Sequence, residues 1–301
     1  MEEENETFLP LQHLRLEDEN NDQDQEDGSS SPDIRNEEDE LNDEHEEENS
    51  KISRVKEIHE ITGYEFHDPN LLQQAFTHHS YKEGICPSFE RLAFVGDAVL
   101  DLFFATDHYS LYPDLDPGKL TRLRAANVDT EKLARVALKH HLHTLLRHDM
   151  FLLAAQIEEF EKAVNEYPVH SSGLIDAPKV LADIVESLVG AIYIDSDSSM
   201  DTTCKIVKNL LEPIISPASL PTQPVTLLYE ICQREKLTLK MRDTWKETGE
   251  IEFLIVKEEQ EELAVVNNVG RAKYSGKKVI AKNRAALNAY SQIIQMLNHQ
   301  S

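Results

Sequence analysis

The chain has 301 residues, of which 40% are hydrophobic, and its formal net charge is −26 at pH 7. This apolar content is enough for one or two hydrophobic cores, and we expect two domains. The negative charge excludes a nucleic-acid partner only if it is spread evenly, because phosphate binding depends on local Lys and Arg. It is concentrated instead, since residues 1–50 hold about 21 Asp and Glu against two Arg. We expect this segment to be a disordered acidic tail.

Several classes of protein are excluded by what the sequence lacks. Its first residues, MEEENETFLP, are too acidic for a secretory or organellar targeting signal, and no apolar run is long enough to cross a bilayer. Three widely spaced cysteines form neither a disulfide framework nor a zinc motif. We expect a soluble intracellular protein of the nucleus, the cytoplasm or both, with no membrane partner.

The first half of the ordered chain is predicted to be helical. From residue 51 to residue 212 apolar side chains recur every three to four positions, with almost no strand alternation. The stretch 213–223 then contains three prolines, at positions 213, 217 and 221, and we interpret it as a linker.

Residues 224–298 have a different pattern. VTLLYEICQREK is typical of an amphipathic helix, TLKMRDTW, EIEFLIVKE and ELAVVNNVG are typical of strands, and KKVIAKNRAALNAYSQIIQML is helical again. This order predicts a small α-β-β-β-α domain of the α+β class. Residues 268–301 hold six Lys or Arg and no Asp or Glu, which indicates a local phosphate-binding surface.

Acidic residues recur at helical spacing in ERLAFVGDAVLDLFF. Glu90, Ala93, Asp97 and Asp101 are three, four and four residues apart, so they project to one side of a helix. The other positions are mostly apolar, Phe94 among them, and we therefore expect this helix to be buried. A carboxylate on a buried helix requires a cation or hydrogen-bond donors, because burying it alone costs several kcal/mol.

A second acidic pair lies in KVLADIVESLVGAIYIDSD. Asp183 and Glu186 are three residues apart on another apolar helix, with Lys179 one turn earlier. Either pair alone is compatible with a solvated helix face. Together, two apolar helices that carry acids suit one or two Mg²⁺ ions, which prefer oxygen ligands. Such ions catalyse phosphodiester hydrolysis by activating water and stabilising the attacking and leaving oxygens.

These motifs resemble the ribonuclease III family. Its signature ERLEFLGDAVL agrees with ERLAFVGDAVL at nine of eleven positions, and LLQQAFTHHSY, GKLTRLRAANV and PKVLADIVESLVGAIYID are similar to its other helical blocks, in the same order. The resemblance implies an all-α endonuclease domain that forms a homodimer and cleaves double-stranded RNA with Mg²⁺ or, alternatively, Mn²⁺. The metal ligands that it implies are Asp97, Asp183 and Glu186, and Lys179 stands with them among the catalytic residues.

The chain departs from this family at one metal ligand. Ala93 occupies the position of the second Glu of the signature, and Pro117 replaces an acidic residue before LTRLRA. Glu90 is on the same helix face as Asp97 but about 10.5 Å away along the axis, against about 6 Å for Ala93. We expect Glu90 to assist as a catalytic and metal-binding residue through water. The alternative is a catalytically silent protein that binds double-stranded RNA.

The C-terminal region resembles a double-stranded RNA-binding domain. Duplex RNA is recognised mainly through its phosphates and 2′-hydroxyls, which suits a helix that begins with lysines. The resemblance implies that Lys277, Lys278 and Lys282 bind phosphates and that Glu230 and Gln233 contact a minor groove. The family's Gly-Pro-x-His loop element is missing, so we expect weaker binding. For the acidic tail, competition with RNA and a purely solubilising role are both open.

Overall fold

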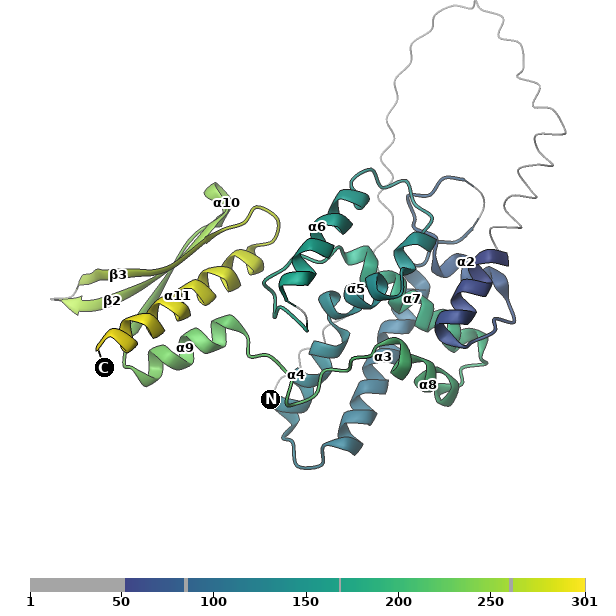
Figure 1. Ribbon diagram of the computed structural model, residues 1–301, viewed down its shortest axis with the longest axis horizontal. Coiled ribbons are helices and arrows are strands. Elements are labelled where there is room, and N and C mark those ends of the chain that lie inside the picture. Colours follow the sequence, from purple (N-terminus) through teal and green to yellow (C-terminus); the bar gives the residue numbers. More distant parts are fainter. Residues whose placement is uncertain (1–51, 84–85, 168, 260–261, 301) are drawn as a thin grey trace, which may run out of the picture. The chain divides into compact units, whose positions relative to one another are not determined.

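The structure is a computed structural model, and it describes residues 52–83, 86–167, 169–259 and 262–300 (Figure 1). The predicted acidic tail therefore lies outside the described residues. Those residues belong to one compact unit, Glu46–Ser301, which contains two hydrophobic cores. The first core draws its side chains from residues 58–211 and the second from residues 228–293. The exact domain boundaries, 51–212, 213–223 and 224–298, stay a prediction.

In the described residues the regular elements of the first core are helices, as the sequence predicts, and loop residues such as Tyr64 and Ile175 also belong to it. After a helix over residues 52–62 the elements are α2 (Pro69–Ala75), α3 (Glu90–Leu111), α4 (Pro117–Val128), α5 (Thr130–Lys139), η1 (Leu142–Leu145), α6 (Leu153–Glu166), α7 (Lys179–Asp195) and α8 (Met200–Leu210). Side chains cap several of these helices: Asp68, Asp116 and Asp129 each accept a hydrogen bond from a backbone N–H of the first turn.

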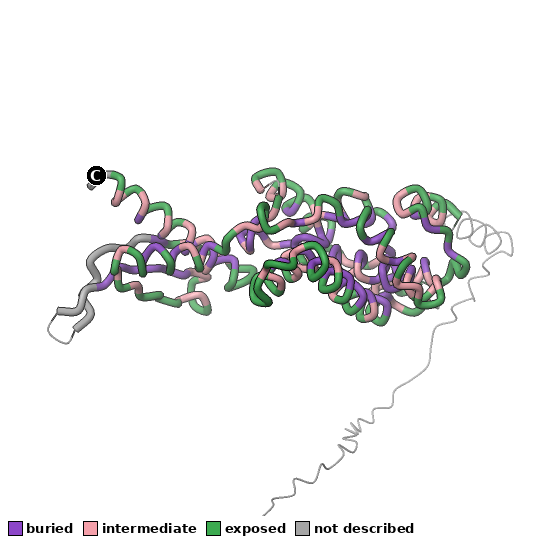
Figure 2. Tube along the Cα trace, turned by 90° about the horizontal axis from the view of Figure 1, so that it is seen from below, coloured by how far each residue is buried: buried purple, intermediate pink, exposed green. Residues whose placement is uncertain are grey.

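Helix α7 is the centre of this core. Most of its residues are buried, and it packs against α3 and α5. Figure 2 shows the buried residues inside the folded part of the chain and the exposed residues on the outer faces of its helices. Its crossing with α3 is close because glycines face each other: a Cβ on Gly96 would overlap the carbonyl oxygen of Glu186, and a Cβ on Gly190 would overlap that of Leu92. Only glycine permits this approach of two helix backbones. The crossing thereby fixes the positions of the acids that flank these glycines.

The second core joins a sheet to two helices. It begins with α9 (Pro224–Arg234) and continues through β1 (Thr238–Thr244), the short α10 (Trp245–Thr248), β2 (Glu250–Glu259), β3 (Glu262–Lys273) and α11 (Lys278–Gln300). The strands form an antiparallel sheet in the order β1-β2-β3. Ile251 and Phe253 of β2 are buried in one cluster with Ala281 and Ala285 of α11. The predicted fold class, a helical domain followed by α-β-β-β-α, is confirmed.

No helix in the described part of the chain combines the length and the hydropathy that a membrane-spanning segment requires.

Candidate active site

The close crossing of α3 and α7 brings acids of both helices together. Asp97 follows Gly96 directly, and the backbone of Gly96 meets the carbonyl of Glu186 itself. Asp183 lies one turn before Glu186 on α7. Asp97, which is exposed, and the half-buried Asp183 and Glu186 therefore lie near the crossing, close enough for both aspartates to act on the charge of Glu186. The sequence placed these three residues in one site, and the helix packing brings them near one another.

The electrostatics of Glu186 reflect this proximity. Burial, followed by the negative charges of Asp183 and Asp97, raises the pKa of Glu186 to about 7, while Lys179 opposes the shift. A carboxyl group with this pKa is only partly ionised near neutral pH. Its ionised form is destabilised by the neighbouring acids, and a bound cation would relieve the repulsion.

Lys179 begins α7 and forms an ion pair with Asp183, one turn further along the helix. The lysine side chain is 76% exposed and that of Asp183 is 15% exposed, so the ammonium group reaches from the surface into the site. This contact holds the Asp183 carboxylate in place and leaves a positive charge at the rim. Both features suit a site that receives a phosphate group.

Glu90 is engaged in a different contact. Nδ1 of His79 lies 2.8 Å from Oε1 of Glu90. Burial alone raises the pKa of Glu90, but hydrogen bonds from Ser88, from its own backbone N–H and from His79 outweigh it and lower the pKa. The predicted assistance of Glu90 to a metal ion stays a prediction.

The predicted burial of the whole α3 helix is wrong. Phe94 is 80% exposed and Glu90 and Asp97 are also exposed, whereas Ala93 is only 7% exposed and belongs to the first core. At 100° per residue, position 93 lies 40° further toward the core than position 97. A small apolar side chain fits there. The apolar composition of α3 therefore reflects a buried face and an exposed apolar face, not burial on all sides.

The donor set at this crossing has the chemistry of a Mg²⁺ site. Three carboxylates supply hard oxygen ligands, and the raised pKa of Glu186 indicates a local excess of negative charge. As the side chains lie, however, no three His, Cys, Asp or Glu residues among the described ranges are grouped closely enough to hold an ion.

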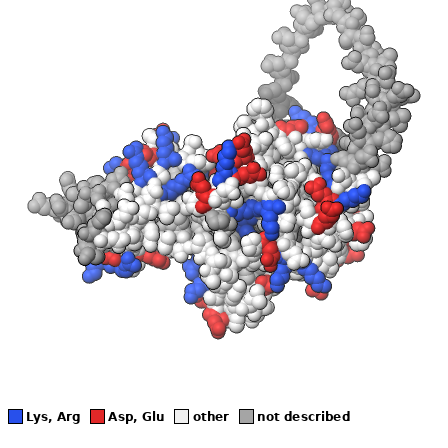
Figure 3. Space-filling view, viewed as in Figure 1, with Lys and Arg blue, Asp and Glu red and all other residues white. Residues whose placement is uncertain are grey.

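The predicted RNA-binding lysines are exposed or half-buried around the start of α11. Lys277 precedes this helix and pairs with Asp176 at 2.6 Å, and Lys278, its first residue, pairs with Asp243. Lys282 has no ion-pair partner among the described residues. In the view of Figure 3, Lys and Arg lie interspersed with Asp and Glu, not in one unbroken patch. The basic run is thus partly neutralised within the fold.

Glu230 and Gln233 are both exposed on α9. Glu230 also borders a cavity of about 580 Å³ whose lining includes Lys119 and Arg122 of α4. In the part of the chain that the structure describes, Glu230 and Gln233 form no hydrogen bond or ion pair with the three lysines around the start of α11. Their predicted contact with a minor groove stays a prediction.

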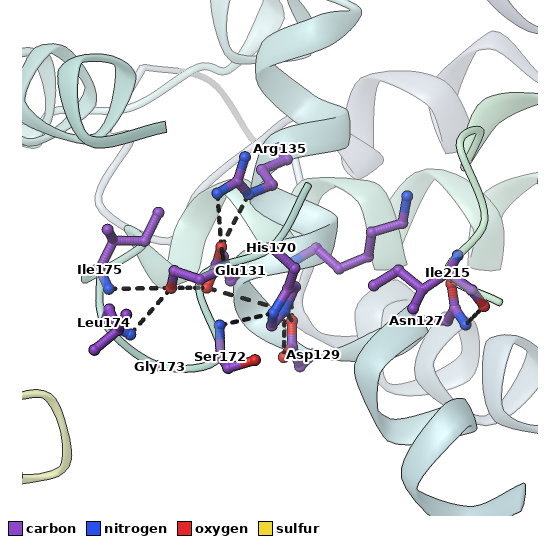
Figure 4. A network of polar contacts seen from close by, with 12 residues as sticks. Asn127, Asp129, Glu131, Arg135, His170, Ser172, Gly173, Leu174, Ile175 and Ile215 are labelled. Atoms are coloured by element: carbon purple, nitrogen blue, oxygen red, sulfur yellow. Dashed lines mark hydrogen bonds and ion pairs between the residues drawn. The ribbon is translucent and has the colours of Figure 1, made fainter. Parts of the chain in front are cut away.

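Sequence reasoning missed a buried polar network beside α7 (Figure 4). The Glu131 carboxylate accepts hydrogen bonds from Nε and Nη2 of Arg135 and from the backbone N–H and hydroxyl of Ser171. Nε2 of His170 lies 2.9 Å from Asp129, and Nδ1 of His170 accepts the backbone N–H of Ser172. No sequence motif pairs these residues, because α5 and the 170–175 loop are far apart in the chain.

The helical fold and the acid-bearing crossing of α3 with α7 define an endoribonuclease of the ribonuclease III type. A family model described as the Ribonuclease III domain matches residues 90–197. "Ribonuclease 3-like protein 3" from Oryza sativa subsp. japonica is 43% identical over 248 residues, which are 81% of this chain and 79% of the relative. The chain belongs to the ribonuclease III family.

A second plant relative and a solved structure are also similar to this chain. "Ribonuclease 3-like protein 1" from the same organism is 41% identical over 197 residues, 63% of this chain and 76% of the relative. One nuclease domain followed by one RNA-binding domain, behind an acidic tail, resembles the type 1 plant ribonuclease three-like proteins, and this match confirms the resemblance. The match to type 3 covers more of the chain. A solved nuclease domain of ribonuclease III from Campylobacter jejuni covers 53% of this chain and 97% of its own, with 28% identity and a TM-score of 0.41.

Proposed function

We propose that the protein cleaves double-stranded RNA by hydrolysis of phosphodiester bonds, with Mg²⁺ or Mn²⁺ held by Asp97, Asp183 and Glu186. The observation that carries the proposal is the raised pKa of Glu186, to about 7, which burial and the charges of Asp183 and Asp97 cause. An excess of carboxylate at a helix crossing is costly for stability. A function that requires a bound cation would account for these neighbouring carboxylates.

Each side chain has a role in this scheme. The ion, when bound, lowers the pKa of a water molecule and stabilises the oxygens of an in-line displacement. Asp97 approaches from α3, and Asp183 and Glu186 approach from α7. Lys179 holds Asp183 by its ion pair and presents its exposed ammonium group to the RNA phosphate. Glu90, held by His79, orients water at the edge of the site.

The C-terminal region positions the duplex in this proposal. Lys277, Lys278 and Lys282 lie around the N-terminus of α11, where the positive end of the helix dipole adds to their charge. Lys282 has the freest ammonium group of the three, since the other two are paired. The region therefore supplies sequence-independent phosphate contacts, and the nuclease domain supplies the chemistry.

We also propose that two copies associate through the exposed face of α3. Phe94, Leu102 and Tyr109 are 80%, 52% and 77% exposed, and their spacing of eight and seven residues places them along one stripe of the helix. Exposed apolar side chains of this size in a row are typical of an interface. The stripe adjoins Asp97, so a second copy on this face would bring two acidic sites to the same duplex.

One observation favours a second function, that of a catalytically silent duplex-binding protein. Ala93 is buried in the core where the family carries a carboxylate ligand, and the remaining acids are not gathered around an ion position in the described structure. Under this alternative the protein shields the duplex without cutting it.

The two functions are separated by incubating the purified full chain with a long RNA duplex over a range of Mg²⁺ and Mn²⁺ concentrations. The proposal predicts progressive shortening by the wild type and none by Asp97→Ala. Retention of an intact duplex by both proteins, with binding demonstrated in the same samples, would establish the silent alternative.

A further inference from the structure

The loop before α7 contacts the start of α11 through consecutive acceptor groups. Nδ2 of Asn283 donates to the carbonyl oxygens of Ser172 and Gly173, at 3.4 and 3.0 Å, and Nε of Arg284 donates to the carbonyl oxygen of Leu174 at 2.8 Å. Asn283 is only 4% exposed. We call residues 171–176 the acceptor loop, because its backbone carbonyls receive these donors.

Asp176 completes the acceptor loop with a charge. Its carboxylate accepts the hydroxyl of Tyr274 at 3.1 Å and pairs with Nζ of Lys277 at 2.6 Å. The guanidinium of Arg284 lies 4.7 Å from the centre of the Tyr274 ring. Five polar contacts thus join the acceptor loop to a surface whose donors are Tyr274, Lys277, Asn283 and Arg284.

Hydrogen bonds to Glu131 and within the acceptor loop hold its conformation, so the loop does not depend on the α11 surface for its shape. Ser171 is fixed by its two hydrogen bonds to Glu131, and its hydroxyl oxygen accepts the backbone N–H groups of Leu174 and Ile175. Gly173 has φ of +82°, and a Cβ there would overlap Nδ2 of Asn283. The loop is therefore preorganised to present its oxygens outward.

We propose that the acceptor loop occupies the phosphate-binding surface of α11 and competes with duplex RNA for it. A row of carbonyl oxygens ending in the Asp176 carboxylate shares two features with an RNA backbone, namely consecutive hydrogen-bond acceptors and a negative charge. Among the donors that meet it, Lys277 is one of the three lysines that the proposed function assigns to phosphate. Duplex binding then displaces the loop, and the contact weakens the affinity for RNA.

This inference rests on the proposed duplex binding, and Asp176→Asn tests it in the full chain. The substitution removes the charge that holds Lys277 but keeps an acceptor for Tyr274. In EDTA, where cleavage is not supported, Asp176→Asn binds a short RNA duplex about two- to fivefold more tightly than the wild type, as expected for a half-exposed ion pair. Glu60→Gln, an exposed site on the helix over residues 52–62, is the matched control for net charge and leaves the affinity unchanged.

Two further variants make the test specific. Tyr274→Phe keeps the ring beneath Arg284 and removes only the hydroxyl, so it produces a smaller gain in affinity. In a Lys277→Ala background, Asp176→Asn produces no gain, because the group that it releases is gone. A gain of equal size with Lys277 present or absent would overturn the proposal, since the acid would then act through the general field of the protein.

A readout without RNA distinguishes failure of this inference from failure of the proposed function. Trp245 is the chain's single tryptophan, and its Nε1 donates to the carbonyl oxygen of Tyr274 at 2.8 Å. Release of the loop alters this neighbourhood, so Asp176→Asn shifts the Trp245 emission and Glu60→Gln does not. If no variant binds duplex RNA, the proposed function fails while the emission shift still supports the contact. Unchanged emission together with unchanged affinity would overturn the inference.

Discussion

Gly96 of α3 and Glu186 of α7 lie so close that a Cβ on the glycine would overlap the carbonyl oxygen of the glutamate. Asp97 and the Glu186 side chain extend from these same backbone positions. The geometry of the acidic site is therefore a consequence of helix packing, and it depends on a residue that carries no functional group.

Gly96→Ala tests this dependence. The methyl group forces α3 and α7 apart, and overpacking of this kind costs about 3 kcal/mol of unfolding free energy. Chemical denaturation measures the loss, and RNA cleavage falls with it because Asp97 moves away from Glu186. Gly118→Ala is the control, since the nearest atom to a Cβ at position 118 is a carboxylate oxygen of exposed Asp116 at 3.2 Å. Equal stability of the two variants would contradict the packing argument.

Mg²⁺ is expected to stabilise the folded wild type. A ligand that binds only the folded state adds about 2.7 kcal/mol at one hundred times its Kd. Thermal unfolding with Mg²⁺ and with EDTA measures this difference. Asp183→Asn and Glu186→Gln lose the stabilisation, whereas Asp107→Asn, also on α3, keeps it. The same Mg²⁺ effect in all four proteins would place the ion elsewhere.

Ala93→Glu restores the family's fourth carboxylate at a buried position. In EDTA the extra buried acid lowers the unfolding free energy by about 2 kcal/mol. Mg²⁺ recovers this loss and raises the cleavage rate above that of the wild type. Ala98→Glu, at an exposed position of α3, is the control and changes neither quantity. A destabilised Ala93→Glu protein that Mg²⁺ does not rescue would show that position 93 lies outside the metal site.

Stability is expected to depend on Lys132 at alkaline pH. Burial, followed by the charges of Lys139 and Arg135, lowers the pKa of Lys132 to about 8, while its Nζ donates to the carbonyl oxygens of Leu211 and Pro213. Between pH 8 and 10.5 the unfolded chain keeps this proton and the folded protein releases it. The unfolding free energy therefore gains roughly 3 kcal/mol across that window.

Lys132→Met isolates this effect. The variant loses two hydrogen bonds at every pH, but it lacks the titrating group, so the difference in unfolding free energy between wild type and variant grows in favour of the wild type from pH 8 to 10.5. Denaturation curves at pH 7.5, 9 and 10.5 measure the difference. A constant difference would mean that Lys132 titrates alike in both states.

Lys282 is expected to contribute a sequence-independent phosphate contact. Lys282→Ala weakens duplex binding and reduces the slope of log K against log salt concentration by about 0.7 to 0.9, the value for one phosphate contact. Lys56→Ala, on the helix over residues 52–62, is the control. Binding titrations between 50 and 200 mM salt supply the slopes. An unchanged slope for Lys282→Ala would remove this residue from the interface.

Local patterns in the sequence predicted the fold class well. The 3.6-residue period of α3 and α7 and the apolar, partly β-branched run of β2 are strong signals, because each of these elements buries apolar side chains. The same reasoning failed for Phe94. An apolar pattern around a helix predicts that its side chains are shielded from water. The pattern does not distinguish burial in the protein's own core from burial in an interface with a second protein.

Tertiary pairing was beyond the reach of sequence patterns. The basic run of residues 268–301 looks unopposed along the chain, yet Lys277 meets Asp176 and Lys278 meets Asp243 in the fold. The contact between His79 and Glu90 likewise joins α3 to the segment before it. Such pairs form only when the elements pack together, and the two residues of a pair have no characteristic sequence separation that would predict the contact.

The most direct test of the account is the rate at which the full chain shortens a long RNA duplex in Mg²⁺, compared with that of Glu186→Gln. Matched melting curves in EDTA show that the variant is folded. The account predicts cleavage by the wild type and a loss of at least about a hundredfold in the variant, since a catalytic metal ligand is removed. Equal cleavage rates for the two proteins would contradict the claim that the crossing of α3 and α7 is the active site.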